Sequence, residues 1–347
     1  MAKFKIETCP QESVDELCEY IDSDWVKEHI FVKSRMLLDW QHLNKSGQYN
    51  FIIARDPLND EICGVLGFVF TSHFSELLES ERDVWLAIWK VREGAKYSGL
   101  GLKLLAYLKR EYKVKTICSI GLSKTVVPMY KFLKFDVGQL KQFVLINENI
   151  SKYNVIELGA YSQSEEKNDK SHTLTRLNDE DILSISKSEA KEIFSSYPKK
   201  NVEYIINRFI KHPIYTYEIY SINYQGIIKG LIVTRVIEVN NSKVMRIIDF
   251  QGIYESLSYL NNQLLAIIVK KGCEYIDFVQ KGIPEDYLTS AGFVDVNNIE
   301  GLIVPEYFEP LVKKNITLDY ARLGDESNFL LCKGDSDQDR PSKIKGP

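Results

Sequence analysis

Two glycines, Gly99 and Gly101, lie one residue apart before a leucine-rich run in the stretch KYSGLGLKLL, residues 96–105. The apolar run predicts a helix that begins near Gly99, and a helix N-terminus carries unpaired backbone N–H groups and a partial positive charge. Glycines there allow a phosphate to approach the backbone closely, so the stretch is typical of a pyrophosphate-binding turn. No G-K-[ST] follows, which excludes a nucleotide P-loop, and two glycines are too few for the dinucleotide fingerprint. A plain strand–turn–helix corner is the alternative interpretation.

The elements around this turn predict an α/β fold. A strand over residues 84–91 precedes the turn, and Leu102, Leu105, Leu108 and Tyr112 share one face of the helix that follows it. The rest of the first half predicts strands at 51–56, 62–70, 116–122 and 142–146 and helices at 13–20, 26–43 and 127–133.

The second half repeats this order of elements. Its patterns predict helices at 180–194, 202–211, 257–271 and 285–290 and strands at 217–223, 227–238, 244–250, 275–279 and 299–304. The polar stretch YSQSEEKNDKSHT between the halves has no periodicity and predicts a linker. We therefore expect a duplicated fold with domains at 1–160 and 174–333, a linker at 161–173 and a polar tail at 334–347.

The overall composition is that of an ordinary globular protein. Hydrophobic residues make up 44% of the 347 residues and the net charge is -4, which argues against a general nucleic-acid binder. The longest apolar runs, 62–70 and 264–269, are too short to cross a membrane, and the N-terminus lacks a signal-peptide core. The six cysteines form no C-x-x-C pair. We expect buried free thiols, no metal site and a cytoplasmic location.

The string from Val91 to Leu105 resembles the acyl-CoA-binding signature of the GNAT N-acyltransferases. In that family a valine closes strand four and [RQ]-x-x-G-x-[GA] leads into a leucine-rich helix. Lys96 stands where Arg or Gln is usual, and a lysine can still meet a phosphate as a point charge. The resemblance implies acyl-CoA as co-substrate, bound by Trp89, Val91, Lys96, Tyr97, Ser98, Gly99, Leu100, Gly101 and Leu102.

A second family element covers residues 129–135, MYKFLKF, which is similar to the family segment Y-x-x-x-G-F with Lys134 in place of glycine. In many members this tyrosine protonates the leaving thiolate, which implies an acid role for Tyr130; an ordinary helix-face aromatic is the alternative. Many members also carry a carboxylate base on or near strand four, but residues 84–91 contain no acid. The base would come from His29, Asp249 or a water chain, or be unnecessary for a weakly basic sugar amine.

The corresponding corner of the second half, residues 248–256, has one glycine, no basic residue and the added acid Asp249. We expect a GNAT-like domain that has lost its cofactor loop and forms one wall of the acceptor site. The resemblance implies two GNAT-like domains in tandem, each a mixed, mostly antiparallel sheet flanked by helices. The whole arrangement resembles tandem-GNAT sugar N-acyltransferases of bacterial surface-polysaccharide pathways, through WVKEHI (25–30), DWQH (39–42) and the segment 333–341. This implies transfer of an acetyl or 3-hydroxybutyryl group to a dTDP-linked 3-amino-3,6-dideoxyhexose for O-antigen or capsule synthesis, by a monomer or homodimer.

Several polar and aromatic residues are candidates for acceptor binding. His29 would hold a sugar hydroxyl or receive the amine proton, and a structural histidine is equally consistent. The tail acids mimic a calcium loop, but Arg340 and Gly346 occupy the positions of its glycine and glutamate, so no metal is expected. Arg340 would instead meet a diphosphate, with a disordered acidic end as the alternative. The predicted acceptor-binding residues are Trp40, whose alternative place is the core, Gln41, Asp249, Asp337, Asp339 and Arg340.

Two other functions stay open. Tandem-GNAT enzymes of another kind transfer aminoacyl groups to cell-wall peptides, and a protein amine is a further possible acceptor. The peptidoglycan enzymes use aminoacyl-tRNA and need no pyrophosphate loop, so the glycine turn argues against them. A non-catalytic acyl-CoA-binding module would have no reason to retain Tyr130 where the thiolate leaves.

Overall fold

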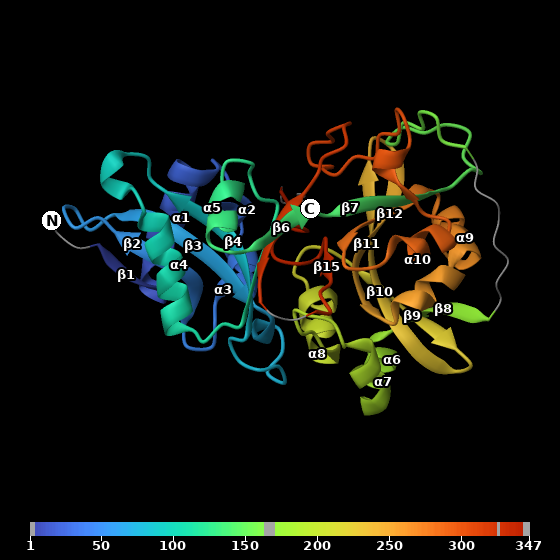
Figure 1. Ribbon diagram of the computed structural model, residues 1–347, viewed down its shortest axis with the longest axis horizontal. Coiled ribbons are helices and arrows are strands. Elements are labelled where there is room, and N and C mark those ends of the chain that lie inside the picture. Colours follow the sequence, from blue (N-terminus) through green and yellow to red (C-terminus); the bar gives the residue numbers. More distant parts are fainter. Residues whose placement is uncertain (1–3, 163–170, 325–326, 343–347) are drawn as a thin grey trace.

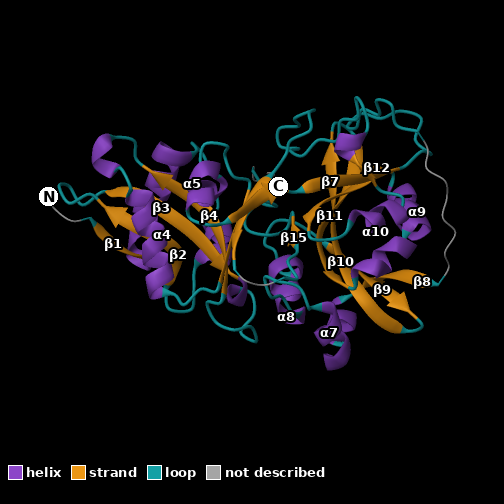
Figure 2. Ribbon diagram, in the orientation of Figure 1, coloured by secondary structure: helices purple, strands orange, loops and turns teal. Residues whose placement is uncertain are grey.

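The computed structural model describes residues 4–162, 171–324 and 327–342. Two open mixed sheets lie side by side, each flanked by helices (Figures 1 and 2). The predicted architecture of two sheets flanked by helices is confirmed. In spatial order the first sheet consists of β1 (Lys5–Pro10), β2 (Gln48–Arg55), β3 (Ile62–Phe70), β4 (Asp83–Val91), β5 (Thr116–Ile120), β14 (Asp319–Leu323) and β6 (Asp136–Gln139).

The second sheet has the same kind of mixed pairing. In spatial order it consists of β13 (Val294–Asp295), β7 (Lys141–Ile146), β12 (Cys273–Lys281), β11 (Ser242–Gly252), β10 (Ile227–Val239), β9 (Glu218–Tyr224) and β8 (His172–Leu177), with β15 (Leu331–Cys332) paired to β12. Only β4–β5 in the first sheet and β11–β12 in the second are parallel among the paired strands of the described residues.

Each sheet contains one strand from the other half of the sequence. Strand β7 lies before the expected linker in the sequence but pairs with β12 of the second sheet. Strand β14 lies after that linker but pairs with β5 and β6 of the first sheet. Figure 1 shows β6 near the centre of the molecule and β7, which follows it, in the half that holds β12. The sheets therefore do not divide at the expected linker. Strand β8 begins at His172, inside that linker, and residues 163–170 lie outside the described residues.

Helices flank both sheets (Figure 2). They are α1 (Val14–Tyr20), α2 (Ile30–Lys33), α3 (Arg35–His42), α4 (Leu100–Glu111), α5 (Val127–Phe132), α6 (Asp179–Leu183), α7 (Lys187–Ile193), α8 (Val202–Ile205), α9 (Asn261–Lys271) and α10 (Glu285–Ser290). The helix expected over 26–43 breaks at Ser34, whose extended backbone lets its side chain cap Leu37 N. The helix expected over 180–194 breaks where Ser186 and Glu189 form a capping box.

One expected strand is absent, and the core joins the two halves. Residues 299–304 form no strand, since only Ile303 bridges Glu157. A single apolar cluster contains Trp85 and Cys118 from the first sheet and Ile248 from the second. Burial of apolar surface between the sheets therefore fixes them relative to one another. No described helix is long and apolar enough to span a membrane, and the six cysteines are free.

Candidate active site

The parallel strands β4 and β5 separate after a short paired stretch, and a cavity opens where they diverge. Pairing runs from Asp83↔Thr116 to Leu86↔Ser119. Beyond that point β4 continues along β3 alone, while β5 ends at Ile120. Residues 87–91 and 119–123 line opposite walls of a cavity of about 670 Å³. The edge of β4 that faces the cavity is therefore not paired with any strand of the described residues.

The N-terminus of α4 presents free backbone donors at one end of this cavity. Gly99 caps the helix with a left-handed backbone, φ 74°, and a Cβ there would meet nothing within 4 Å. Within the described residues, no hydrogen bond joins the backbone N–H groups of residues 99–102 to a protein acceptor. Gly101 lines the cavity, where an added Cβ would lie 3.1 Å from Trp89 Nε1. An anion such as a pyrophosphate fits this exposed helix end.

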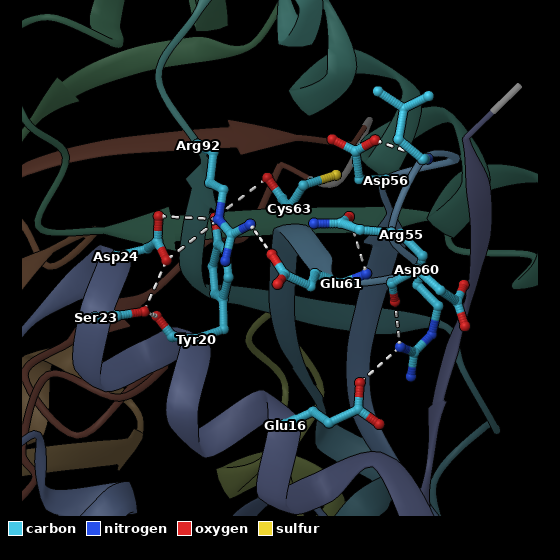
Figure 3. A network of polar contacts seen from close by, with 12 residues as sticks. Glu16, Tyr20, Ser23, Asp24, Arg55, Asp56, Asp60, Glu61, Cys63 and Arg92 are labelled. Carbon is cyan, nitrogen blue, oxygen red and sulfur yellow. Dashed lines mark hydrogen bonds and ion pairs between the residues drawn. The ribbon is translucent and has the colours of Figure 1, made fainter. Parts of the chain in front are cut away.

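A polar network fixes the loop that joins β4 to α4 (Figure 3). The backbone N of Arg92 donates to Cys63 O at 2.9 Å, and its guanidinium donates to Glu61 at 2.9 Å and to Asp24 at 3.4 Å. Tyr20 donates to Lys90 O at 3.3 Å. Sequence patterns could not predict this network, because Glu61 and Asp24 lie 31 and 68 residues from Arg92 along the chain.

Part of the predicted cofactor segment faces away from the cavity. Trp89, Val91 and Gly101 line it, whereas Lys96 donates to Asp56 Oδ2 at 2.8 Å and Tyr97 donates to the same oxygen at 2.7 Å. The hydrogen bonds from Lys96 and Tyr97 lower the pKa of Asp56 to about 2. The Lys96 ammonium is therefore paired with Asp56, and its contact with a phosphate stays a prediction. The remaining residues of the segment do not line the cavity: Ser98, Gly99, Leu100 and Leu102.

Tyr130 lies in the wall of the cavity, as its predicted role requires. It comes from α5, is 2% exposed, and meets Trp89 edge to face with ring centroids 5.8 Å apart. Burial raises the pKa of Tyr130 to about 12, against a smaller opposite effect of the neighbouring Ser119. The phenol is therefore protonated at neutral pH and can donate a proton into the cavity.

The C-terminal segment is ordered as far as residue 342 and runs between the diverging strands. Ser336 Oγ donates to Leu86 O and Gln338 Nε2 donates to Ile120 O, each at 2.9 Å. Asp337 between them is 5% exposed and lines the cavity. The alternative of a disordered acidic end is wrong for residues 334–342, and residues 343–347 lie outside the described part.

The far wall of the cavity comes from the second half and carries paired charges. Asp339 receives hydrogen bonds from Arg235 at 2.6 Å and from Tyr217 at 2.8 Å. Burial acts to raise the pKa of Asp339, but the Arg235 guanidinium outweighs it and holds the pKa below its usual value. Arg340 forms an ion pair with Asp337. The cavity thus brings together three predicted acceptor residues, Asp337, Asp339 and Arg340.

The other predicted acceptor residues do not line the cavity. Trp40 packs into the core against His212, with ring centroids 4.6 Å apart. Gln41 is 1% exposed and contacts His42 Nε2 at 3.1 Å. Asp249 is fully buried and accepts from Lys200 at 2.5 Å. The prediction that Trp40, Gln41 and Asp249 lie beside an acceptor is therefore corrected. Trp40 and Gln41 are packed inside the protein, and Asp249 is held in a buried ion pair.

The hydrogen bonding of His29 excludes one of its two predicted roles. Its Nδ1 accepts from the backbone N of Phe31 at 3.2 Å, so the proton of the neutral ring is on Nε2. Burial lowers the pKa of His29 to about 4, so the ring is neutral at pH 7. With Nδ1 occupied and Nε2 protonated, the ring has no free lone pair for an amine proton. Nε2 is buried and has no hydrogen-bond partner among the described residues.

In the second sheet, the equivalent opening is filled by the chain itself. Strands β11 and β12 pair in parallel as far as Ile247↔Phe278. Beyond that point Cys332 of β15 pairs with Gln280 of β12, and Gly334 N donates to Ile248 O at 2.7 Å. The C-terminal segment therefore closes the second opening and bridges only the narrow end of the first, so a ligand-sized cavity remains at the opening between β4 and β5.

Comparisons with known proteins identify the fold. No family model and no curated protein matches the sequence. Among solved structures, a GCN5-related N-acetyltransferase from Anabaena variabilis aligns with a TM-score of 0.54 at 12% identity, over 92% of this chain and 72% of that chain. A GCN5-related N-acetyltransferase from Sphaerobacter thermophilus aligns over 94% and 98% of the two chains (TM-score 0.46, 11% identity). Saccharomyces cerevisiae N-myristoyltransferase with bound myristoyl-CoA aligns over 94% and 80% (0.46, 9%). The chain has the GNAT fold, in two mixed sheets.

Proposed function

We propose that this protein is an acyl-CoA-dependent N-acyltransferase. The observation that carries the proposal is a single cavity that joins the N-terminus of α4, the open edge of β4 and Tyr130 to the carboxylates and guanidinium groups of the second half. A donor bound at the first end and an acceptor bound at the second would meet beside Tyr130. A binding-only module would not need the second end.

The donor end offers the groups that an acyl-CoA requires. The backbone N–H groups of residues 99–102 would hold the pyrophosphate, because they are unpaired and lie at the positive end of the α4 dipole. The free edge of β4 from Ala87 to Val91 would pair with the pantetheine amides, since no strand of the described residues pairs with that edge. Trp89 would pack beside the pantetheine chain.

The proposed reaction is direct attack of an amine on the thioester. A backbone N–H of β4 near Ile88 or Trp89 would donate to the carbonyl oxygen as it becomes an oxyanion. The C–N bond forms, the C–S bond breaks, and Tyr130 gives its proton to the departing sulfur. The phenol is suited to this step because burial keeps it protonated.

We further propose that the acceptor amine belongs to a nucleotide-linked amino sugar, in the narrowest form a dTDP-linked 3-amino-3,6-dideoxyhexose used for O-antigen or capsule synthesis in the cytoplasm. This step rests on the resemblance of residues 25–42 and 333–341 and on the chemistry of the acceptor end. Asp337 can accept from an amine, and Arg340, whose side chain is 28% exposed in the cavity, can donate to a phosphate.

A thiol-release assay tests the proposal. Acetyl-CoA or 3-hydroxybutyryl-CoA would be combined with single dTDP- and UDP-amino sugars, with a free amino sugar, and with a peptide that carries a free amine. Thiol release that needs both an acyl-CoA and a nucleotide-linked amino sugar is expected. Release with the peptide alone would keep the acyltransferase but replace the sugar acceptor, and CoA binding without release from any pair would leave a binding module.

A further inference from the structure

Strand β4 has no carboxylate that could take a proton from an acceptor amine. Its single acid, Asp83, lies at the paired end of the strand and does not line the cavity. Asp83 also accepts from Arg82 at 2.8 Å and from Lys199 N at 2.9 Å. A base for the proposed reaction must therefore come from another part of the chain.

Among the described residues, four carboxylates line the cavity: Glu306, Glu309, Asp337 and Asp339. Two of these four are held by buried cations. Glu306 is paired with Arg246 and Lys333, whose side chains are 2% and 3% exposed. Asp339 is bound by Arg235 and Tyr217. These two acids are therefore engaged in buried ion pairs. Glu309 and Asp337 are the remaining candidates.

The neighbours of Asp337 place it where β4 and β5 separate. Ser336 is hydrogen bonded to Leu86, the last residue of β4 that pairs with β5, and Gln338 is hydrogen bonded to Ile120, the last residue of β5. The backbone of Asp337 therefore lies at the apex of the opening, next to the free edge where the thioester would lie. Ser336 adopts a left-handed backbone, φ 57°, which is costly for a residue with a side chain and is concentrated at functional sites.

The partner of Asp337 differs from the partners of the other tail acids. Asp335 is paired with Lys200 and Asp339 with Arg235, whose side chains are 1% and 12% exposed. Asp337 is paired with Arg340, whose side chain is 28% exposed and lies in the cavity. An incoming ligand can therefore reach the Asp337–Arg340 pair without opening the core.

We propose that Asp337 is the general base of the reaction and that Arg340 orients it and binds an anionic or hydroxyl group of the acceptor. This inference rests on the proposed acyltransferase function. The acceptor ammonium gives one proton to Asp337, which passes it to water, and the neutral amine attacks the thioester carbon. The nitrogen then loses a second proton, which returns to Tyr130 in place of the proton that Tyr130 gave to sulfur. The products are an amide, a thiol and one released proton.

The charged and titratable groups around Asp337 come from three parts of the chain. Arg340 belongs to its own segment and pairs with it. His29 from the first half and Tyr307 from the second half interact with it electrostatically. His29 is neutral, and its Nδ1 accepts from Phe31 N, so it does not compete for the proton.

The test is the pH dependence of the maximal rate of thiol release for wild type and Asp337→Asn, with the pair of substrates that gives the highest wild-type rate. The substitution should lower kcat by about 10²- to 10⁴-fold, the usual contribution of general acid–base catalysis, and remove the acid limb of the profile. The dissociation constant of CoA, measured by calorimetry, should stay within about twofold because the donor end is untouched. Asp337→Glu should restore part of the rate together with the acid limb.

Two matched variants separate catalysis from stability. Asp335→Asn removes a carboxylate from the same segment that does not line the cavity, and it should lower the thermal midpoint while the acid limb remains. Glu309→Gln tests the other candidate acid. A wild-type profile in Asp337→Asn, or loss of the acid limb in Glu309→Gln instead, would overturn the assignment of Asp337. A wild type that binds CoA but acylates nothing would overturn the proposed function and with it this inference, whereas an active Asp337→Asn enzyme overturns the inference alone.

Discussion

Replacement of Gly101 by valine should weaken acyl-CoA binding at the N-terminus of α4. Gly101 faces the cavity, and even a Cβ would lie 3.1 Å from Trp89 Nε1, closer than an ordinary contact. The two extra methyl groups of valine would project into the space that the pyrophosphate needs. The helix itself tolerates the change, because valine costs only a few tenths of a kcal/mol more than most residues in a helix.

The size of the effect follows from the hydrogen bonds that become inaccessible. A hydrogen bond to a charged group contributes about 1.5–3 kcal/mol, so loss of one phosphate contact predicts a 10- to 150-fold increase in the dissociation constant, at roughly 1.4 kcal/mol per tenfold. Isothermal titration calorimetry with CoA measures this directly.

The matched control is Gly272→Val at the C-terminus of α9. Gly272 is also at a helix end, has a left-handed backbone with φ 66°, and faces open space. Valine there should lower the thermal midpoint, since a left-handed backbone costs an L-residue about 1–2 kcal/mol, and leave CoA affinity unchanged. Wild-type CoA affinity in Gly101→Val, or equal loss of affinity in both variants, would refute the assignment of the donor site.

Three further predictions follow from the described contacts. Tyr130→Phe should lower kcat by about 10²-fold or more with unchanged CoA affinity; because the pKa of Tyr130 is about 12, wild-type kcat should show no loss from tyrosine ionisation below about pH 10. Lys200→Met should lower the free energy of unfolding in urea by about 3–5 kcal/mol, because it leaves Asp249 and Asp335 buried without their cation. Burial lowers the pKa of His29 to about 4, so its contribution to stability is present above pH 6.5 and is lost as the pH falls toward 4. Between pH 7 and pH 4.5, the free energy of unfolding measured in urea should therefore fall by about 2–3 kcal/mol less in His29→Gln than in wild type.

Local patterns in the sequence predicted the elements around the donor end. The strand at 84–91, the glycine turn and the leucine-rich helix are continuous in sequence, so their spacing carries the information. The orientation of Lys96 was not predictable, because its partner Asp56 lies 40 residues earlier and the pairing depends on how β2 ends beside the turn.

The acceptor end depends on contacts between distant segments. The exchange of β7 and β14 between the sheets and the passage of residues 333–340 between β4 and β5 are long-range events with no periodic signal. Short strands such as β15 are also invisible to pattern analysis, since two residues carry no alternation. The polar character of the tail suggested either disorder or a site. Burial of Asp335, Asp337 and Asp339 against cations explains how so polar a segment can lie inside the protein.

Mass spectrometry of the acceptor would show whether one cavity brings a thioester and an amine together. Wild-type protein would be incubated with acetyl-CoA and each nucleotide-linked amino sugar, and both the acylated sugar and the free thiol would be quantified. We expect one acyl group on the amine for each thiol released, and no acylated sugar with Tyr130→Phe on the same timescale. Thiol release without an acylated acceptor would contradict this expectation, because the cavity would then be hydrolysing the donor and not transferring its acyl group.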